Sequence, residues 1–136
     1  MKKYKFLLVA SNFYPEITLN LLKGAQKYLE INGHKFDIAF TKGSLEIPTK
    51  ISMKLSKSKY DAVVAIGCII KGKTDHYEFI ANAITRTLLE LSIHSKLPIS
   101  NSILTCRNIK QAKERSSKKL NRAKEAVEAA IAVLED

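Results

Sequence analysis

Short apolar runs alternate along the chain with stretches in which apolar residues recur every three or four positions. The runs at residues 5–10, 36–40, 62–66 and 98–104 predict β-strands. The periodic stretches predict helices that begin near Pro15, Pro48 and Asp75, and two more within residues 109–134, parted near residues 116–121. Alternation of strand and helix is typical of parallel strands joined by crossover helices. The pattern therefore predicts one α/β domain at residues 1–136, a three-layer αβα sandwich around a four-stranded parallel sheet.

The length and composition agree with a single domain. The chain has 136 residues, of which 46% are hydrophobic, and it contains no low-complexity block. The apolar segment at residues 6–10 is too short for a secretory signal, and no stretch is long enough to cross a bilayer. Cys68 and Cys106 lie in apolar runs without metal-binding spacing. We therefore expect two reduced thiols in a cytoplasmic protein that does not bind a membrane.

The positive charge is concentrated in one segment. The formal net charge is +10. Residues 107–124 carry eight basic side chains and one acidic one, Glu114. Such a segment is typical of a solvated helix face, a nucleic-acid-binding module or a site for a phosphorylated small molecule. Because no aromatic residues are interleaved with the basic ones and no nucleic-acid-binding motif is present, we expect no nucleic acid partner.

The ends of the predicted strands carry the candidate chemistry, because sheets of this kind bind ligands at the carboxyl ends of their strands. These ends lead into predicted loops at residues 11–14, 41–46, 67–76 and 105–108. Phe13, in the first loop, either packs against the protein or stacks on a ligand ring. Glu46, at a helix start, either complements the helix dipole or accepts hydrogen bonds from ligand hydroxyl groups.

The third loop combines an anion-binding pattern with a histidine. The sequence GKT at residues 72–74 offers backbone N–H groups near a helix start, although a Walker A spacing is missing. His76 is predicted in the first helical turn, where the dipole favours a neutral imidazole that can act as a base. The histidines lie on separate elements, so no metal site is expected. A flavodoxin-like binder of a phosphorylated cofactor would use the same loops but leaves His76 without a role.

Six ordered segments resemble the lumazine synthase family, and the resemblance runs nearly from end to end. They are NFYPEIT at 12–18, GSLEIP at 43–48, GCIIKGKTDHYEFI at 67–80, PISNSILT at 98–105, IKQAKER at 109–115 and NRAKEAVEAA at 121–130. The resemblance implies a flavodoxin-like fold and a transferase of riboflavin biosynthesis. The implied reaction condenses 5-amino-6-(D-ribitylamino)uracil with 3,4-dihydroxy-2-butanone 4-phosphate and releases phosphate and water. It implies no cofactor.

The resemblance also assigns roles to individual residues. His76 is implied to be catalytic, as the proton-transfer residue. The residues implied to bind the pyrimidine and ribityl parts are Phe13, Ser44, Leu45, Glu46, Cys68, Ile69, Ile70 and Asn101. Those implied to bind the butanone phosphate are Lys73, Thr74 and Arg115.

Finally, the resemblance implies an assembly. The family's site is shared between neighbouring subunits of a homopentamer, with Arg115 contributed by the next chain. Some members build a shell of 60 subunits, and riboflavin synthase is a candidate partner. Several positions differ from the usual family pattern. Asn101 makes the pyrimidine pocket more polar, Arg122 stands for the usual lysine, and Lys73 adds a cation beside the implied phosphate site. The other differences are Lys42, Ala123 and a segment between Arg115 and Asn121 that is one residue shorter.

Overall fold

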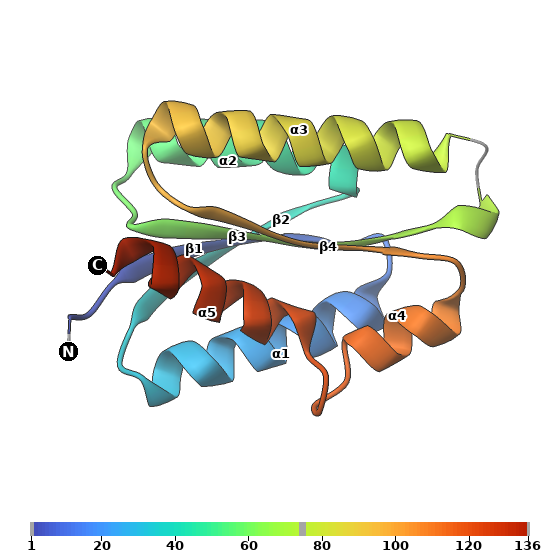
Figure 1. The fold of residues 1–136 in the computed structure, drawn as a ribbon, viewed down its shortest axis with the longest axis horizontal. Coiled ribbons are helices and arrows are strands. Elements are labelled where there is room, and N and C mark those ends of the chain that lie inside the picture. The colour runs from blue at the N-terminus through green and yellow to red at the C-terminus, as the bar shows by residue number, and fades with distance from the viewer. Residues whose placement is uncertain (1, 74–75, 136) are drawn as a thin grey trace.

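The computed structural model describes residues 2–73 and 76–135, and it confirms the predicted alternation of strands and helices (Figure 1). The elements in chain order are β1 (Lys5–Ser11), α1 (Pro15–Ile31), β2 (Lys35–Thr41), the 3-10 turn η1 (Ser44–Glu46), α2 (Ile47–Lys57), β3 (Ala62–Ile70), the 3-10 turn η2 (Lys71–Lys73), α3 (Tyr77–Ser95), β4 (Ile99–Cys106), α4 (Ile109–Arg115) and α5 (Arg122–Leu134).

The four strands form one parallel sheet in the order β2-β1-β3-β4. This is the order of the first strands of flavodoxin-like folds. Every residue of β3 is buried, because this strand has a neighbour on each side and helices over both faces. The strand β4 lies at one edge of the sheet and exposes Asn101 and Thr105. The predicted three-layer αβα fold is confirmed.

Two apolar cores lie on the two faces of the sheet. On one face α1, α4 and α5 cover Phe6, Leu8, Ile66 and their neighbours. On the other face α2 and α3 cover Leu7, Val9 and their neighbours (Figure 1). Successive strand residues therefore alternate between the cores, as a pleated strand requires. Cys68 and Cys106 are both buried in the first core as free thiols, which agrees with the prediction.

The third strand is longer than predicted. Residues 67–70 were predicted to begin a loop, whereas β3 continues to Ile70. Gly67 serves a different purpose: a Cβ there would lie 2.8 Å from Ser44 Oγ, so the glycine lets η1 approach the strand. The helix α3 begins at Tyr77 and His76 is its N-cap residue, so the histidine lies just before the first turn. Thr74 and Asp75 lie outside the described residues.

The ends of the other helices follow from local sequence. Pro15 opens α1, where a missing N–H group costs no hydrogen bond. Gly33 takes a positive φ of 75° directly after the C-cap of α1. Asn108 and Asn121 cap α4 and α5, since each side chain accepts hydrogen bonds from backbone N–H groups of the first turn. In the described part of the chain, the helices are all too short or too polar to traverse a lipid bilayer.

Candidate functional site

A cavity of 430 Å³ opens at the carboxyl ends of β1, β2 and β3. Its walls are mostly apolar. The residues that line it are Phe13, Tyr14, Lys42, Gly43, Ser44, Leu45, Glu46, Cys68, Ile69 and Ile80. We call it the ring cavity. Its volume is within the range of small-molecule sites, and its position is the one at which parallel α/β sheets bind ligands.

An aromatic corner forms one side of the ring cavity. Phe13 follows β1 and is 67% exposed, so its ring is not part of a core. It meets Tyr14 edge to face, with 5.0 Å between the ring centroids. Burial raises the pKa of the Tyr14 hydroxyl, and the nearby Cys68 raises it further. An exposed ring fixed beside a cavity is suited to stacking on a flat ligand.

The turn η1 supplies polar groups on another side. Glu46 is exposed at the N-cap position of α2, and its Oε1 accepts a hydrogen bond of 2.9 Å from the N–H group of Gly43. This bond orders the carboxylate and leaves Oε2 for other donors. Ser44 is buried, and its Oγ has no hydrogen-bond partner among the described residues. A buried hydroxyl group without a partner is costly, so its position at the cavity indicates a group that binds a ligand.

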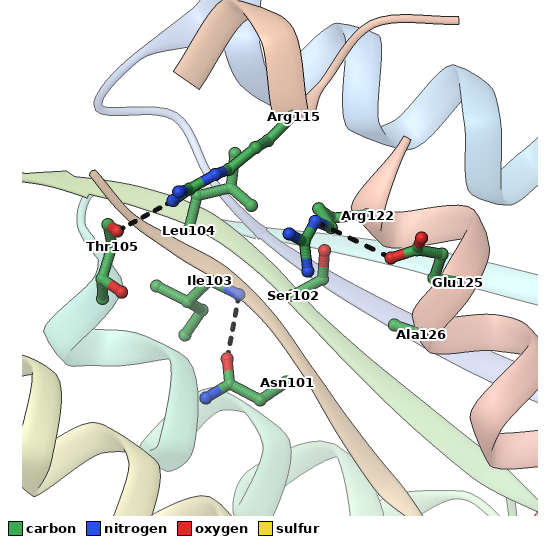
Figure 2. Close-up of a pocket in the computed structure, with 9 residues that line it drawn as sticks. All are labelled: Asn101, Ser102, Ile103, Leu104, Thr105, Arg115, Arg122, Glu125 and Ala126. Carbon is green, nitrogen blue, oxygen red and sulfur yellow. Dashed lines mark hydrogen bonds and ion pairs between the residues drawn. The ribbon is translucent and has the colours of Figure 1, made fainter. Parts of the chain in front are cut away.

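A second cavity, of 440 Å³, lies at the exposed edge of the sheet beside β4 (Figure 2). We call it the edge cavity. Its lining residues are Asn101, Ser102, Ile103, Leu104, Thr105, Arg115, Arg122, Glu125 and Ala126. Figure 2 shows the guanidinium groups of Arg115 and Arg122 on one side of β4 and Asn101 on the other. Two guanidinium groups beside one cavity are suited to binding an anion.

The two arginines of the edge cavity are held differently. Arg115, the last residue of α4, is half-buried, and its Nη1 donates hydrogen bonds to Thr105 O at 3.2 Å and to Cys106 Sγ at 3.6 Å. Arg122 is exposed and forms an ion pair with Glu125, with 3.7 Å between Nε and Oε2. Since exposed pairs are weak, Arg115 is the better-ordered cation of the two.

The structure divides the predicted site residues between the two cavities. Six of them, Phe13, Ser44, Leu45, Glu46, Cys68 and Ile69, line the ring cavity. Asn101 and Arg115 line the edge cavity instead. Ile70 is buried and lines neither, and His76 is exposed at the start of α3 without lining either cavity. Thr74 lies outside the described residues, and for Lys73 only the backbone is described.

Sequence reasoning missed several lining residues. Tyr14, Gly43 and Ile80 contribute to the ring cavity, and Glu125 contributes to the edge cavity. Tyr14 and Gly43 were within the predicted loops and could have been included for that reason alone. Ile80 had no signal, because its apolar side chain matches the core face of α3. Within residues 2–73 and 76–135, no cluster of three metal-binding side chains is found.

Comparison with known proteins extends the similarity over the whole chain. The family model described as 6,7-dimethyl-8-ribityllumazine synthase matches residues 3–136. A protein of that name from Bartonella tribocorum is 40% identical over 135 residues, which cover 98% of this chain and 89% of that protein. One from Bartonella henselae is 41% identical over 136 residues, covering 98% and 88%.

A more distant match comes from another genus. A protein named 6,7-dimethyl-8-ribityllumazine synthase from Methylobacterium radiotolerans is 37% identical over 131 residues, which cover 96% of this chain and 80% of that protein. The residues that match the family model span all the strands and helices described above, including both cavities. The chain therefore belongs to the 6,7-dimethyl-8-ribityllumazine synthase family.

Proposed function

We propose that this chain is a transferase of riboflavin biosynthesis that makes 6,7-dimethyl-8-ribityllumazine. The substrates are 5-amino-6-(D-ribitylamino)uracil and 3,4-dihydroxy-2-butanone 4-phosphate, and phosphate and water leave. Membership of the family supports the activity. The observation that carries the assignment to this structure is the ring cavity, which combines an exposed ring, an unpartnered hydroxyl group and an ordered carboxylate at the carboxyl edge of the sheet.

The ring cavity is the site for the ribitylaminouracil. The exposed face of Phe13 stacks on the flat pyrimidine, while the buried walls at Cys68 and Ile69 present backbone groups to its edge. Ile70, the last residue of β3, continues this wall. Ser44 and Leu45 border the ribityl chain, and Glu46 accepts hydrogen bonds from its hydroxyl groups.

The phosphorylated substrate requires cations. Arg115 supplies a guanidinium fork that matches two phosphate oxygens, and Lys73 and Thr74 bind the same group from the segment before α3. In the single chain, however, Arg115 lines the edge cavity and not the ring cavity. Asn101, which the resemblance places at the pyrimidine, also lines the edge cavity.

This separation supports a site shared between two copies of the chain. The edge cavity of one subunit completes the ring cavity of the next, which yields a closed ring such as the pentamer. Exposed apolar side chains on α3, namely Phe79, Leu89 and Ile93, are available to bury between copies. A pentamer is the smallest assembly we propose. Pentamers could assemble further into a shell of 60 subunits. Riboflavin synthase is a separate proposed partner of the assembled enzyme.

His76 moves the protons. The reaction forms an imine from an amine and a ketone, expels phosphate and closes a ring, so protons are transferred repeatedly. An imidazole at the start of α3, next to the ring cavity through Ile80, is placed to exchange them. Holding both substrates in adjacent cavities removes much of the entropic barrier. No cofactor takes part in these steps, and the two buried free thiols are consistent with a cytoplasmic location.

The direct test is to mix the purified protein with both substrates and follow the fluorescence of the lumazine product. The two substrates also condense without enzyme, so the spontaneous rate is the control. We expect acceleration that saturates with each substrate. Equal rates with and without protein would exclude the activity. Salt-sensitive binding of DNA or RNA in place of turnover would support a nucleic-acid-binding module instead.

A further inference from the structure

The guanidinium group of Arg115 is anchored to the end of β4 by two acceptors. One is the carbonyl oxygen of Thr105, and the other is the sulfur of Cys106. Both contacts are made by Nη1, so the remaining N–H groups of the fork are left for other partners. The carbonyl and sulfur acceptors together determine the direction in which the side chain points. Cys106 is fully buried, so its sulfur is fixed by the surrounding core.

The Cys106 thiol is part of a chain of polar contacts that runs through the sheet. Cys68 on β3 forms a hydrogen bond with Cys106, and Cys68 also lines the ring cavity. The charged groups near Cys106 are Arg115 of α4 and Arg122 of α5. The hydrogen bond from Cys68 lowers the pKa of Cys106 and outweighs burial, and the two arginines lower it further. The pKa of Cys68 is raised by the same hydrogen bond and by burial. Because the guanidinium group of Arg115 contacts the Cys106 sulfur, a thiolate formed by the pair is favoured at Cys106.

We propose that Cys106 is a positioning residue for Arg115: its neutral sulfur aims the guanidinium group at the phosphorylated substrate, and its ionised sulfur holds that group back. A neutral thiol is a weak acceptor, so it orients Arg115 without consuming its charge. A thiolate is an anion in direct contact with the same guanidinium group, so it competes with the phosphate. This inference rests on the proposed role of Arg115 in binding phosphate.

Two substitutions separate orientation from ionisation. Cys106→Ser keeps an acceptor next to Arg115 but cannot ionise in the working pH range, whereas Cys106→Val fills the same space without an acceptor. We expect Cys106→Val to raise KM for the butanone phosphate roughly three- to tenfold, with a smaller change in kcat. We expect Cys106→Ser to keep KM near the wild-type value at neutral pH.

The ionisation is tested with sulfate, which is a dianion throughout the pH range and so does not titrate itself. Sulfate inhibition competitive with the butanone phosphate is measured on the assembled enzyme at about pH 6 and about pH 9. We expect the wild-type protein to bind sulfate more weakly at the higher pH, and Cys106→Ser to lose most of this pH dependence. A pH dependence that is equal in both proteins would overturn the inference.

Two further variants distinguish failure of the inference about Cys106 from loss of core packing and from failure of the proposed phosphate site. Val64→Ala removes buried volume from the same core on β3, so it controls for loss of packing and should leave KM for the butanone phosphate unchanged. Arg115→Ala should abolish sulfate inhibition. If it does so while Cys106→Val leaves KM unchanged, Cys106 does not position Arg115. If Arg115→Ala itself leaves sulfate inhibition unchanged, the proposed phosphate site is wrong.

Discussion

Ser44 lies directly over Gly67, so that a Cβ on the glycine would stand 2.8 Å from Ser44 Oγ. The next nearest atom is Cβ of Ser11, at 3.3 Å. The Ser44 hydroxyl group can therefore occupy its position at the ring cavity only because residue 67 of β3 has no side chain. This contact sets the height of η1 above the sheet, and with it the position of Leu45 and Glu46.

Gly67→Ala should push η1 away from β3 and damage the ring cavity. Because Ser44 is buried, we expect a loss of about 1–3 kcal/mol in the free energy of unfolding, together with a higher KM for the ribitylaminouracil. Denaturant unfolding and steady-state kinetics measure the two effects. Gly72→Ala is the matched control for stability, because a Cβ on Gly72 meets nothing within 4 Å.

The cause of this effect can be isolated by a second substitution. Ser44→Ala removes the atom that the new methyl group meets, so the unfolding cost of Gly67→Ala should be smaller in the Ser44→Ala background. Additive costs in the double variant would show that the strain arises elsewhere, for instance at Ser11.

Subunit complementation tests the shared site. His76→Ala and Arg115→Ala should each be nearly inactive alone, the first through turnover and the second through use of the butanone phosphate. Subunits mixed in equal amounts and reassembled should regain activity, because about a quarter of the sites then combine an intact ring cavity with an intact edge cavity of the neighbour. Glu46→Ala mixed with His76→Ala is the control, since both changes fall on the same side of the site and no intact site can form.

The outcome of mixing is decisive in either direction. Recovery in the mixture and none in the control places the two cavities of one active site on different chains. An active monomer, or a mixture that stays inactive despite exchange of subunits, would contradict the shared site. Light scattering on the same samples distinguishes a pentamer from a 60-subunit shell.

The sequence predicted the elements that carry the site better than it predicted the contacts within it. Phe13 and Glu46 were predicted to lie in loops at the carboxyl ends of the strands, and both line the ring cavity, because alternation of strand and helix puts the carboxyl ends of all parallel strands at one edge. Gly67 was predicted to lie in a loop, since a glycine in a strand and one in a loop look alike in the sequence, where the neighbour that approaches the glycine is not seen. That neighbour, Ser44, is brought there only by the folded chain.

The contact between Cys106 and Arg115 was beyond sequence reasoning for a similar reason. The two residues belong to different elements, and their distance depends on how α4 packs against β4. The burial of Cys106 was predictable from its apolar run. The lowering of its pKa was not, because the groups that cause it come from β3, α4 and α5.

Asn121 joins the C-terminal helices to α1, and its loss should be costly. Its Oδ1 accepts hydrogen bonds from Ala123 and Lys124, and its Nδ2 donates to Asn20 O at 2.8 Å. We expect Asn121→Ala to lower the free energy of unfolding by about 3 kcal/mol, since it removes a helix cap and buried hydrogen bonds together. Asn108→Ala removes only an exposed cap on α4 and should cost about 1 kcal/mol.

Gly24 provides an independent check on the same contact. A Cβ on Gly24 would lie 2.2 Å from Cγ of Asn121, so Gly24→Ala should displace this side chain although alanine favours helices. Destabilisation by Gly24→Ala should be much smaller in the Asn121→Ala background. Denaturant unfolding measures both. If Gly24→Ala lowered the free energy of unfolding equally with Asn121 and with Ala at that position, the absence of a side chain on Gly24 would not serve to make room for Asn121.

His34 should make the stability of the fold depend on pH. It is buried under β1, where its Nδ1 accepts a hydrogen bond of 3.0 Å from the N–H group of Tyr4. Burial lowers the pKa of His34, the nearby Lys3 lowers it further, and Glu135 acts in the opposite direction. Because the folded-state pKa lies below the unfolded value, the unfolded chain takes up the proton first. Stability is then complete above about pH 6.5 and falls as the pH drops through the folded-state pKa of His34.

His34→Asn tests this dependence, because the amide oxygen of asparagine can accept the same hydrogen bond but cannot be protonated in this range. We expect the wild-type protein to lose stability between neutral and mildly acidic pH, and the variant to lose less over the same interval in denaturant unfolding. The exposed His94→Asn is the matched control and should behave as the wild-type protein does. Equal slopes in the wild type and His34→Asn would mean that the folded state does not lower the pKa of His34, and that acid sensitivity arises from other groups.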